Sequence, residues 1–247
     1  MIPEEFRAGR VVMVVAHPDD ETIGAGGLLP QFRRLLIVHV TDGAPRGLGA
    51  GRLDLARLRR EELMCALQIA GISPGQTRTL DYVDQEAMLD MAGLGRRIAD
   101  ILEECGPTAV VTHPYEGGHP DHDATAFGVH MACALQAISP PIYEFPCYHA
   151  GLDGSMETGS FLPGQDAGVV VILSPEERQR KARMFECFRS QQEVLRRFAI
   201  GEERFRRAPA YDFTSPPHAG KLWYENWDWG ITGERWRRLA VEALEAA

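Results

Sequence analysis

The sequence of 247 residues is poor in cysteine and contains no cysteine motif. Its five cysteines are odd in number and widely spaced, and no two of them form a C-x-x-C pair. A disulfide framework is therefore not indicated, and we expect free thiols in a reducing cytoplasm. These cysteines are Cys65, Cys105, Cys133, Cys147 and Cys187.

Long apolar runs and an excess of positive charge are also missing. No run of about 18 apolar residues occurs, so we expect no membrane span. The N-terminal stretch 1–6 lacks a basic segment followed by an apolar one, so we expect no signal peptide. The formal net charge of −9 argues against nucleic acid or an anionic membrane as the main partner.

The composition that remains suits one α/β domain. At 247 residues and 45% hydrophobic, the chain can bury a sizeable core. Short apolar runs alternate with longer amphipathic segments, which predicts strands and helices in turn. The predicted strands are 11–15, 35–40, 79–85, 108–112, 142–146 and 168–173, and the predicted helices are 54–70, 92–105, 124–137 and 175–198. We expect a single domain over 1–247, with 199–247 as a C-terminal extension packed on it.

The first polar cluster follows the most apolar strand. Residues 11–15 and Ala16 have no polar face, which is typical of a central strand in a parallel sheet. His17-Pro18-Asp19-Asp20-Glu21 follows directly, and Pro18 suits the first position of a helix. Because His17 and Asp20 are three residues apart, one helical turn brings them to the same side. Together they could supply two of the three protein ligands of a metal site. Glu21 is expected to support the helix start and not to act in catalysis.

A second cluster follows the strand at 108–112. Three histidines and three acidic residues fall within 113–123. A polar loop with Asp121 as a helix N-cap explains the turn residues. It does not explain why His119 and His122 repeat the three-residue spacing of the first cluster, again with a proline after the first histidine. We therefore predict His122 as the third ligand.

Two histidines and one aspartate form the three-ligand set of a catalytic zinc site, with one position open for water. The predicted ligands are His17, Asp20 and His122. Zn²⁺ is preferred, and Fe²⁺ or another divalent ion such as Mn²⁺ also suits such a mixed set. Asp19 is next to two ligands but not on their shared side, so it can act as the general base. His119 is the natural electrophile or acid, and Asp121 can orient it.

Several further polar residues allow two interpretations each. Asp42 ends a predicted strand, where it is either a site residue or a loop cap. Arg46 lies in the glycine-rich loop 44–51, where it either meets the substrate or is solvated. His39 is interpreted as a core histidine, and the charged run 59–62 as a solvent-exposed helix face. The basic residues of 175–198 and the tryptophans at 223, 227 and 229 are left without an assigned role.

The paired motifs resemble those of the LmbE / PIG-L family of metal-dependent N-deacetylases. The resemblance rests on His17-Pro18-Asp19-Asp20-Glu21 and His119-Pro120-Asp121-His122, supported by Val40-Thr41-Asp42-Gly43 and Arg59-x-x-Glu62. It implies a Rossmann-like three-layer α/β fold, with a mostly parallel sheet and helices on both faces. It also implies removal of an N-acetyl group from an amino-sugar small molecule.

The same resemblance implies roles for individual residues. His17, Asp20 and His122 become the metal ligands, Asp19 the general base, and His119 the group that stabilises the oxyanion or acts as the acid. Some members carry a tyrosine two residues before the first histidine of the second motif. This chain has Gly117 there and Tyr115 two residues earlier, so no acid role is carried over to a tyrosine.

Two alternatives use the same core. The first is an amidase acting on a thiol conjugate or an antibiotic intermediate. The second is a non-catalytic metal- or carbohydrate-binding protein, against which Asp19 argues because a metal does not need it. The sequence leaves open the sugar, the aglycone, the acyl group and the formation of homo-oligomers.

Overall fold

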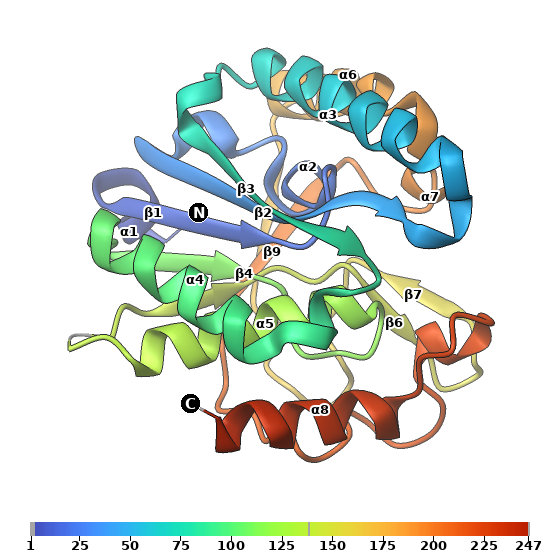
Figure 1. Ribbon diagram of the computed structural model, residues 1–247. Coiled ribbons are helices and arrows are strands. Elements are labelled where there is room, and N and C mark those ends of the chain that lie inside the picture. The colour runs from blue at the N-terminus through green and yellow to red at the C-terminus, as the bar shows by residue number, and fades with distance from the viewer. Residues whose placement is uncertain (1–2, 138, 247) are drawn as a thin grey trace.

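The centre of the molecule is a seven-stranded sheet, seen edge-on between helices in the computed structural model of Figure 1. The structure describes residues 3–137 and 139–246. The strand order is β3-β2-β1-β4-β5-β9-β8. The strands are β1 (Arg10–Val15), β2 (Arg34–Pro45), β3 (Thr77–Asp84), β4 (Ala109–Thr112), β5 (Ile142–Glu144), β8 (Val169–Ile172) and β9 (Glu202–Arg207). A separate hairpin joins β6 (Tyr148–Ala150) and β7 (Met156–Thr158).

The sheet is mostly parallel, as the sequence predicted. Strands β3, β2, β1, β4 and β5 pair in parallel, whereas β9 runs antiparallel to both β5 and β8. Strand β1 lies in the middle and is buried on both faces. Val11, Met13 and Val15 enter one hydrophobic core, and Val12 and Val14 enter the other. This is why β1 reads as an unbroken apolar run.

Helices cover both faces of the sheet and complete a three-layer α/β fold, as expected. In Figure 1, α3 and α6 lie above the sheet and α4, α5 and α8 lie below it. The upper layer contains α1 (Glu4–Ala8), α2 (Asp20–Ala25), α3 (Arg52–Ile69), α6 (Pro175–Cys187) and α7 (Gln192–Leu195). The lower layer contains α4 (Met91–Cys105), α5 (Pro120–Ala134) and α8 (Gly233–Glu245).

The strand order reverses between β1 and β4. From β1 the chain moves outward through β2 and β3, and then it returns to the other side of β1 to form β4 and β5. In sheets of this kind, ligands bind outside the carboxyl ends of the strands at the point of reversal. Both predicted polar clusters follow these two strands, so the topology brings them to one edge.

Two segments differ from the prediction. The helix predicted over 175–198 ends at Cys187 and resumes as α7. At the break, the backbone N–H and the hydroxyl of Ser190 donate to the Glu62 carboxylate over 2.9 and 2.6 Å. Residues 199–247 supply β9 inside the sheet as well as α8 on its surface. The division into a domain and an extension stays a prediction.

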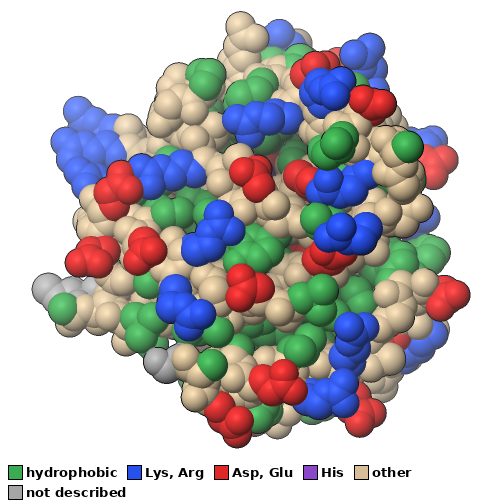
Figure 2. Space-filling model, viewed as in Figure 1, with side chains coloured by type: hydrophobic (Ala, Val, Ile, Leu, Met, Phe, Trp, Pro, Cys, Tyr) green, Lys and Arg blue, Asp and Glu red, His purple; other side chains and the backbone are tan. Residues whose placement is uncertain are grey.

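The surface mixes charges of both signs. On the face in Figure 2, Lys and Arg side chains alternate with Asp and Glu, and no large patch of one sign forms. Across residues 3–137 and 139–246, no helix has the length and apolar character needed to span a membrane. Residues 1–2, which belong to the stretch used for the signal-peptide prediction, lie outside the described residues.

Candidate metal centre

The first corner of the site is a strained turn between β1 and α2. Asp19 precedes the first residue of α2 with a φ of 128°, a backbone conformation that is costly for a residue with a Cβ. Such strain persists where the surroundings hold it, and here α2 is packed closely. A Cβ added at Gly24 would lie 2.1 Å from the Phe145 ring. This contact explains why glycine occurs at this position in the helix.

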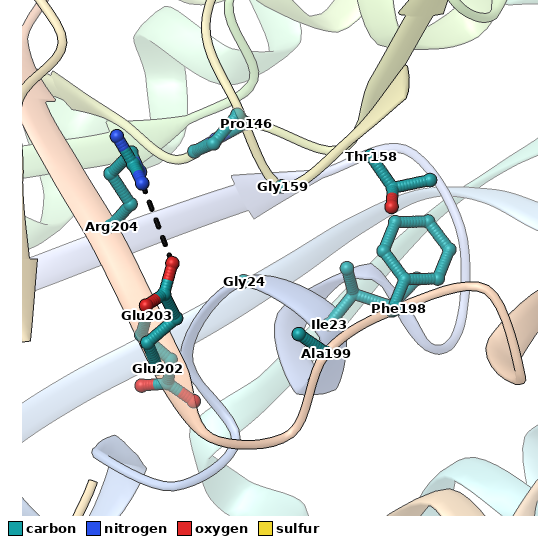
Figure 3. Close-up of a pocket in the computed structure, with 10 residues that line it drawn as sticks. All are labelled: Ile23, Gly24, Pro146, Thr158, Gly159, Phe198, Ala199, Glu202, Glu203 and Arg204. Carbon is teal, nitrogen blue, oxygen red and sulfur yellow. Dashed lines mark hydrogen bonds and ion pairs between the residues drawn. The ribbon is translucent and has the colours of Figure 1, made fainter. Parts of the chain in front are cut away.

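Behind α2 lies a buried ion pair. The Lys181 ammonium is 3.0 Å from the Glu203 carboxylate of β9, and it donates to the Ile23 carbonyl over 2.7 Å. The same Glu203 carboxylate accepts from the Gly27 N–H over 2.7 Å. Figure 3 shows Glu203 beside Gly24 and the Ile23 side chain beside Phe198, all of them lining a cavity of about 70 Å³. Two segments distant in sequence therefore hold α2, and with it the metal-site corner, in place.

The three predicted ligands come together. His17 Nδ1 is 3.2 Å from His122 Nε2 and 3.3 Å from an Asp20 oxygen, and His122 Nε2 is 3.3 Å from the other Asp20 oxygen. Zinc–ligand bonds of about 2.0 to 2.2 Å in a tetrahedron separate neighbouring donor atoms by about 3.3 to 3.6 Å. The two histidine nitrogens therefore have the separation of neighbouring ligands of a tetrahedral ion, and each lies beside one oxygen of the Asp20 carboxylate. The assignment of these residues as ligands stays a prediction.

Two carboxylates lie on the far side of His17. Its Nε2 atom is 3.3 Å from Asp84 and 3.3 Å from Asp121. The Asp121 oxygens also accept from the N–H groups of Gln85 and Ala87, over 2.6 and 3.0 Å. This arrangement of carboxylate, histidine and metal position fixes the ring and leaves Nδ1 free to bind an ion.

The charge balance also suits a cation. The side chains of Asp19, Asp20 and Asp84 are nearly buried in a cavity of about 220 Å³. Among the described residues that line it, Arg59 is the only lysine or arginine. Burial alone raises the pKa of Asp20, but the adjacent His122 and His113 rings outweigh it and hold that pKa well below its usual range. Buried carboxylates in excess of buried cations are expensive unless an ion compensates them.

His113 belongs to the same cluster, and its Nε2 atom lies 3.3 Å from an Asp20 oxygen. Its ring stacks on His122 with the centroids 4.1 Å apart and an angle of 3° between the planes. His113 Nε2 accepts from the Ala16 N–H over 2.9 Å, and Nδ1 lies 3.6 Å from the Cys147 sulfur. It therefore joins the ends of β1 and β4 and braces His122.

Arg59 is buried, so the solvent-exposed face predicted for residues 59–62 is wrong at Arg59 and at Glu62. The Arg59 guanidinium donates to Asp19 Oδ2 over 3.0 Å, to the Pro18 carbonyl over 2.9 Å and to the Gly43 carbonyl over 2.6 Å. Burial raises the pKa of Asp19 to about 8, and Arg59 is the strongest influence in the opposite direction. Arg59 therefore both orients the Asp19 carboxylate and keeps it more acidic than burial alone would.

His119 is held in one tautomer. Its Nδ1 atom accepts from the Asp121 N–H over 3.2 Å, so the ring proton of the neutral form resides on Nε2. Burial holds the pKa of His119 well below its usual value. The Asp121 carboxylate is nearer to His17, at 3.3 Å, than to His119, at 3.9 Å. Asp121 therefore orients His119 through its backbone and His17 through its side chain.

The two predicted substrate-binding residues do not line this cavity. Asp42 pairs with Arg52 and accepts from the Ala44 N–H over 3.0 Å. Arg46 is 70% exposed and forms a bidentate pair with Glu86 at 2.6 and 2.7 Å, in a neighbouring cavity. Their predicted roles stay predictions.

Several lining residues carry no local signal in the sequence. Asp84 is the last residue of β3. Its position at the carboxyl end of a predicted strand is the one sequence feature that could have indicated a role in the site. Tyr148 follows β5 with its ring 5.3 Å from that of His122. The remaining unpredicted lining residues are Ile23, Gln85, Gln191, Val194 and Trp229. Tyr115, by contrast, is buried elsewhere and donates to the Ser215 carbonyl over 2.9 Å.

The fold and the site define an α/β protein with a buried His/Asp cluster, suited to a divalent ion, at the point where the strand order reverses. The chain belongs to the PIG-L family, whose model, described as GlcNAc-PI de-N-acetylase, matches residues 12–133. The matched region includes both motifs.

Individual relatives agree with this assignment. A 1D-myo-inositol 2-acetamido-2-deoxy-alpha-D-glucopyranoside deacetylase of Kineococcus radiotolerans is 31% identical over 209 residues, which are 70% of this chain and 54% of that protein. The chain thus spans about half the length of the curated relatives that it matches first.

Solved structures show the same fold. The N,N'-diacetylchitobiose deacetylase of Pyrococcus horikoshii superposes with a TM-score of 0.60 at 20% identity, over 85% of this chain and 87% of that one. The 4-carboxy-2-hydroxymuconate hydratase of Pseudomonas putida gives 0.57 at 16% identity, over 82% and 98%. The fold therefore hosts more than one reaction, and function has to be argued from the site.

Proposed function

We propose that this protein is a zinc-dependent deacetylase that hydrolyses the N-acetyl group of an amino-sugar-containing small molecule. The observation that carries the proposal is the compact set of His17, Asp20 and His122 with Asp19 beside it in one cavity. Membership of the PIG-L family and relatives named as amino-sugar deacetylases support it. Zinc is the preferred ion, and Fe²⁺ or another divalent ion suits the same donor set.

The ion held by His17, Asp20 and His122 would polarise the amide carbonyl and make the attacking water more acidic. Asp19 accepts the proton of that water as general base. Its carboxylate is held on one oxygen by Arg59 at 3.0 Å, which leaves the other oxygen for the water. The field of Arg59 keeps Asp19 ionised at lower pH than burial alone would allow.

His119 completes the chemistry on the other side of the substrate. Its Nε2–H, fixed by the bond from the Asp121 N–H to Nδ1, stabilises the negative charge that develops on the carbonyl oxygen. The proton collected by Asp19 then goes to the departing amine, while His119 keeps its Nε2 proton. The products are acetate and the free amino sugar. The water supplies hydroxyl to the acetyl carbon and a proton to the nitrogen, so the atoms balance.

Two alternatives use the same residues. An amidase acting on a thiol conjugate or an antibiotic intermediate would share the metal ligands and Asp19 but bind a different acyl donor. A non-catalytic metal- or carbohydrate-binding protein would need the ligands but not Asp19. We also propose that the protein acts in the cytoplasm, where its five free cysteines stay reduced.

The test is acetate release by the purified full-length chain, loaded with zinc, from a panel of N-acetylated amino sugars and their glycosides. We expect acetate and primary amine in equal amounts from at least one of them, and loss of both after chelation. Acetate-free turnover of N-acyl thiol conjugates, with silence across the sugar panel, would favour the amidase. A protein that binds the sugars without turnover would favour the binding protein.

A further inference from the structure

Two cysteines lie in contact in the upper helix layer. The Cys65 sulfur of α3 is 2.6 Å from the Cys187 sulfur at the end of α6. These two helices lie side by side above the sheet in Figure 1 and pack against each other. A disulfide bond joins its sulfurs at about 2.05 Å, so this pair needs only a small approach to form one. The two residues are 122 positions apart in the chain, which is why no local sequence motif indicates the pair.

A second contact holds the two segments in this register. Glu62 precedes Cys65 by three residues, and Ser190 follows Cys187 by three. The buried Glu62 carboxylate accepts from both the backbone N–H and the hydroxyl of Ser190. The two contacts are therefore about one helical turn apart along an antiparallel pair of segments. The fold thus brings the two sulfurs together before any oxidant arrives.

The cysteine pair is open to small solutes. Cys65 is exposed and Cys187 is half-buried, and both line a cavity of about 400 Å³. Cys133 and Cys147, by contrast, are buried. A small oxidant therefore reaches the pair more readily than it reaches the buried thiols.

The two thiols are suited to different steps of an oxidation. Burial, together with the adjacent Cys65 thiol, raises the pKa of Cys187 to about 12. Cys187 is therefore a thiol at neutral pH, and a thiol is a poor nucleophile. Cys65 is the more exposed of the two and meets an oxidant first. Cys187 is then the partner that reacts with the oxidised Cys65 sulfur, with which it is already in contact.

We propose that Cys65 and Cys187 are a redox-active pair, which a peroxide converts into a disulfide that locks α3 to α6. In the first step the Cys65 sulfur attacks one peroxide oxygen. The O–O bond breaks, one water leaves, and Cys65 becomes a sulfenic acid. The Cys187 sulfur then attacks the Cys65 sulfur, the S–O bond breaks, and a second water leaves.

This reaction balances. The two thiols lose two electrons and the peroxide gains them, while the two thiol protons end in the two waters. A small dithiol reverses the reaction by two thiol–disulfide exchange steps. In a reducing cytoplasm the pair therefore stays as thiols until a peroxide appears.

The disulfide braces one side of the metal cavity. Helix α3 also carries Arg59, and the segment after α6 supplies Gln191 and Val194 to the cavity lining. Because the sulfurs are already in contact, we expect these residues to stay in place when the bond forms. The bond acts mainly on the unfolded chain, whose entropy falls when a loop of 122 residues is closed. The inference does not depend on the proposed function, because its readouts are thiol chemistry and stability.

The test treats the purified full-length chain with hydrogen peroxide, removes the excess with catalase, and blocks the remaining thiols before digestion by trypsin without reductant. We expect the tryptic peptides 61–78 and 184–189, which contain Cys65 and Cys187, to be joined to each other. The number of free thiols should fall from five to three. The Tm should rise by about 4 to 16 °C, and dithiothreitol should return it to the starting value.

Three variants decide whether this pair is responsible. Cys65→Ser and Cys187→Ser should each abolish the joined peptides and the rise in Tm. Cys105→Ser is the matched control, because Cys105 is half-buried like Cys187 but ends α4 in the other helix layer. It should keep both effects. A bond to another cysteine or between two chains overturns the proposal, as does oxidation of Cys65 to a sulfinic acid with Cys187 left free. Joined peptides with an unchanged or lower Tm overturn the lock.

Discussion

Replacing Arg59 with glutamine should move the acid side of the pH–activity profile to higher pH. Asp19 acts as a base only when it is ionised. Burial raises the pKa of Asp19 and the Arg59 guanidinium opposes that rise, and the resulting pKa is about 8. Removing this positive charge therefore raises the pKa of Asp19, and activity is lost at a higher pH as the solution is acidified.

The size of the shift follows from the geometry of the pair. The two charged groups are 3.0 Å apart, and their side chains are only 6% and 7% exposed, so solvent screens them weakly. An arginine next to an aspartate lowers its pKa by about 1 to 3 units. A cation bound by the neighbouring ligands would also lower the pKa of Asp19. We therefore expect the loss of Arg59 to shift that pKa by the lower end of this range, about 1 unit. On the acid limb this is a tenfold loss of kcat/KM.

The assay is kcat/KM for acetate release across the acid and neutral range, with zinc content and thermal unfolding measured for each variant. Arg59→Lys keeps the positive charge and should keep most of the wild-type profile. Arg60→Gln is the control, because Arg60 is the exposed neighbour on the same helix. An acid limb that stays in place in Arg59→Gln, or moves equally in Arg59→Lys, would refute the electrostatic argument.

Two further predictions concern the ion and the support behind it. His122→Ala should reduce bound zinc, measured by elemental analysis, from about one per chain to near zero. His130→Gln is the control and should leave the zinc content unchanged. Full zinc occupancy in His122→Ala would remove His122 from the ligand set. Lys181→Met leaves Glu203 charged and unpaired in the interior, so the free energy of unfolding should fall by about 3 to 5 kcal/mol in denaturant titrations. Adding Glu203→Leu should restore part of that loss, and a double variant less stable than the single one contradicts this.

The core of the site was predictable because its parts are local to two strands. Val11–Val15 and Ala109–Thr112 are apolar runs, and each leads directly into its motif. Neighbouring parallel strands end at the same edge, so the two motifs meet without further information. The helical turn expected over His17–Asp20 is wrong, because α2 begins only at Asp20, and the turn at Asp19 brings His17 beside Asp20 instead. The compact set of His17, Asp20 and His122 follows from these features.

The rest of the site depends on contacts that no local pattern encodes. Arg59 lies in a charged run typical of a solvated helix face, and it is buried against the turn after β1 and the last part of β2, whose carbonyls accept from it. Strand β9 was missed because its sequence is mostly charged. Two of those charges are buried in pairs, Glu203 with Lys181 and Arg206 with Glu144. Trp229 reaches the site only through the C-terminal loop.

The most direct measurement is the activity and zinc content of Asp19→Asn. Asparagine keeps the size of the side chain but cannot accept the proton of water at neutral pH. We predict that the variant retains one zinc per chain while kcat for acetate release falls by about 10² to 10⁴, the usual contribution of a general base. Wild-type rates in a zinc-loaded Asp19→Asn protein would contradict the assignment of Asp19 as the base in a metal-assisted deacetylation.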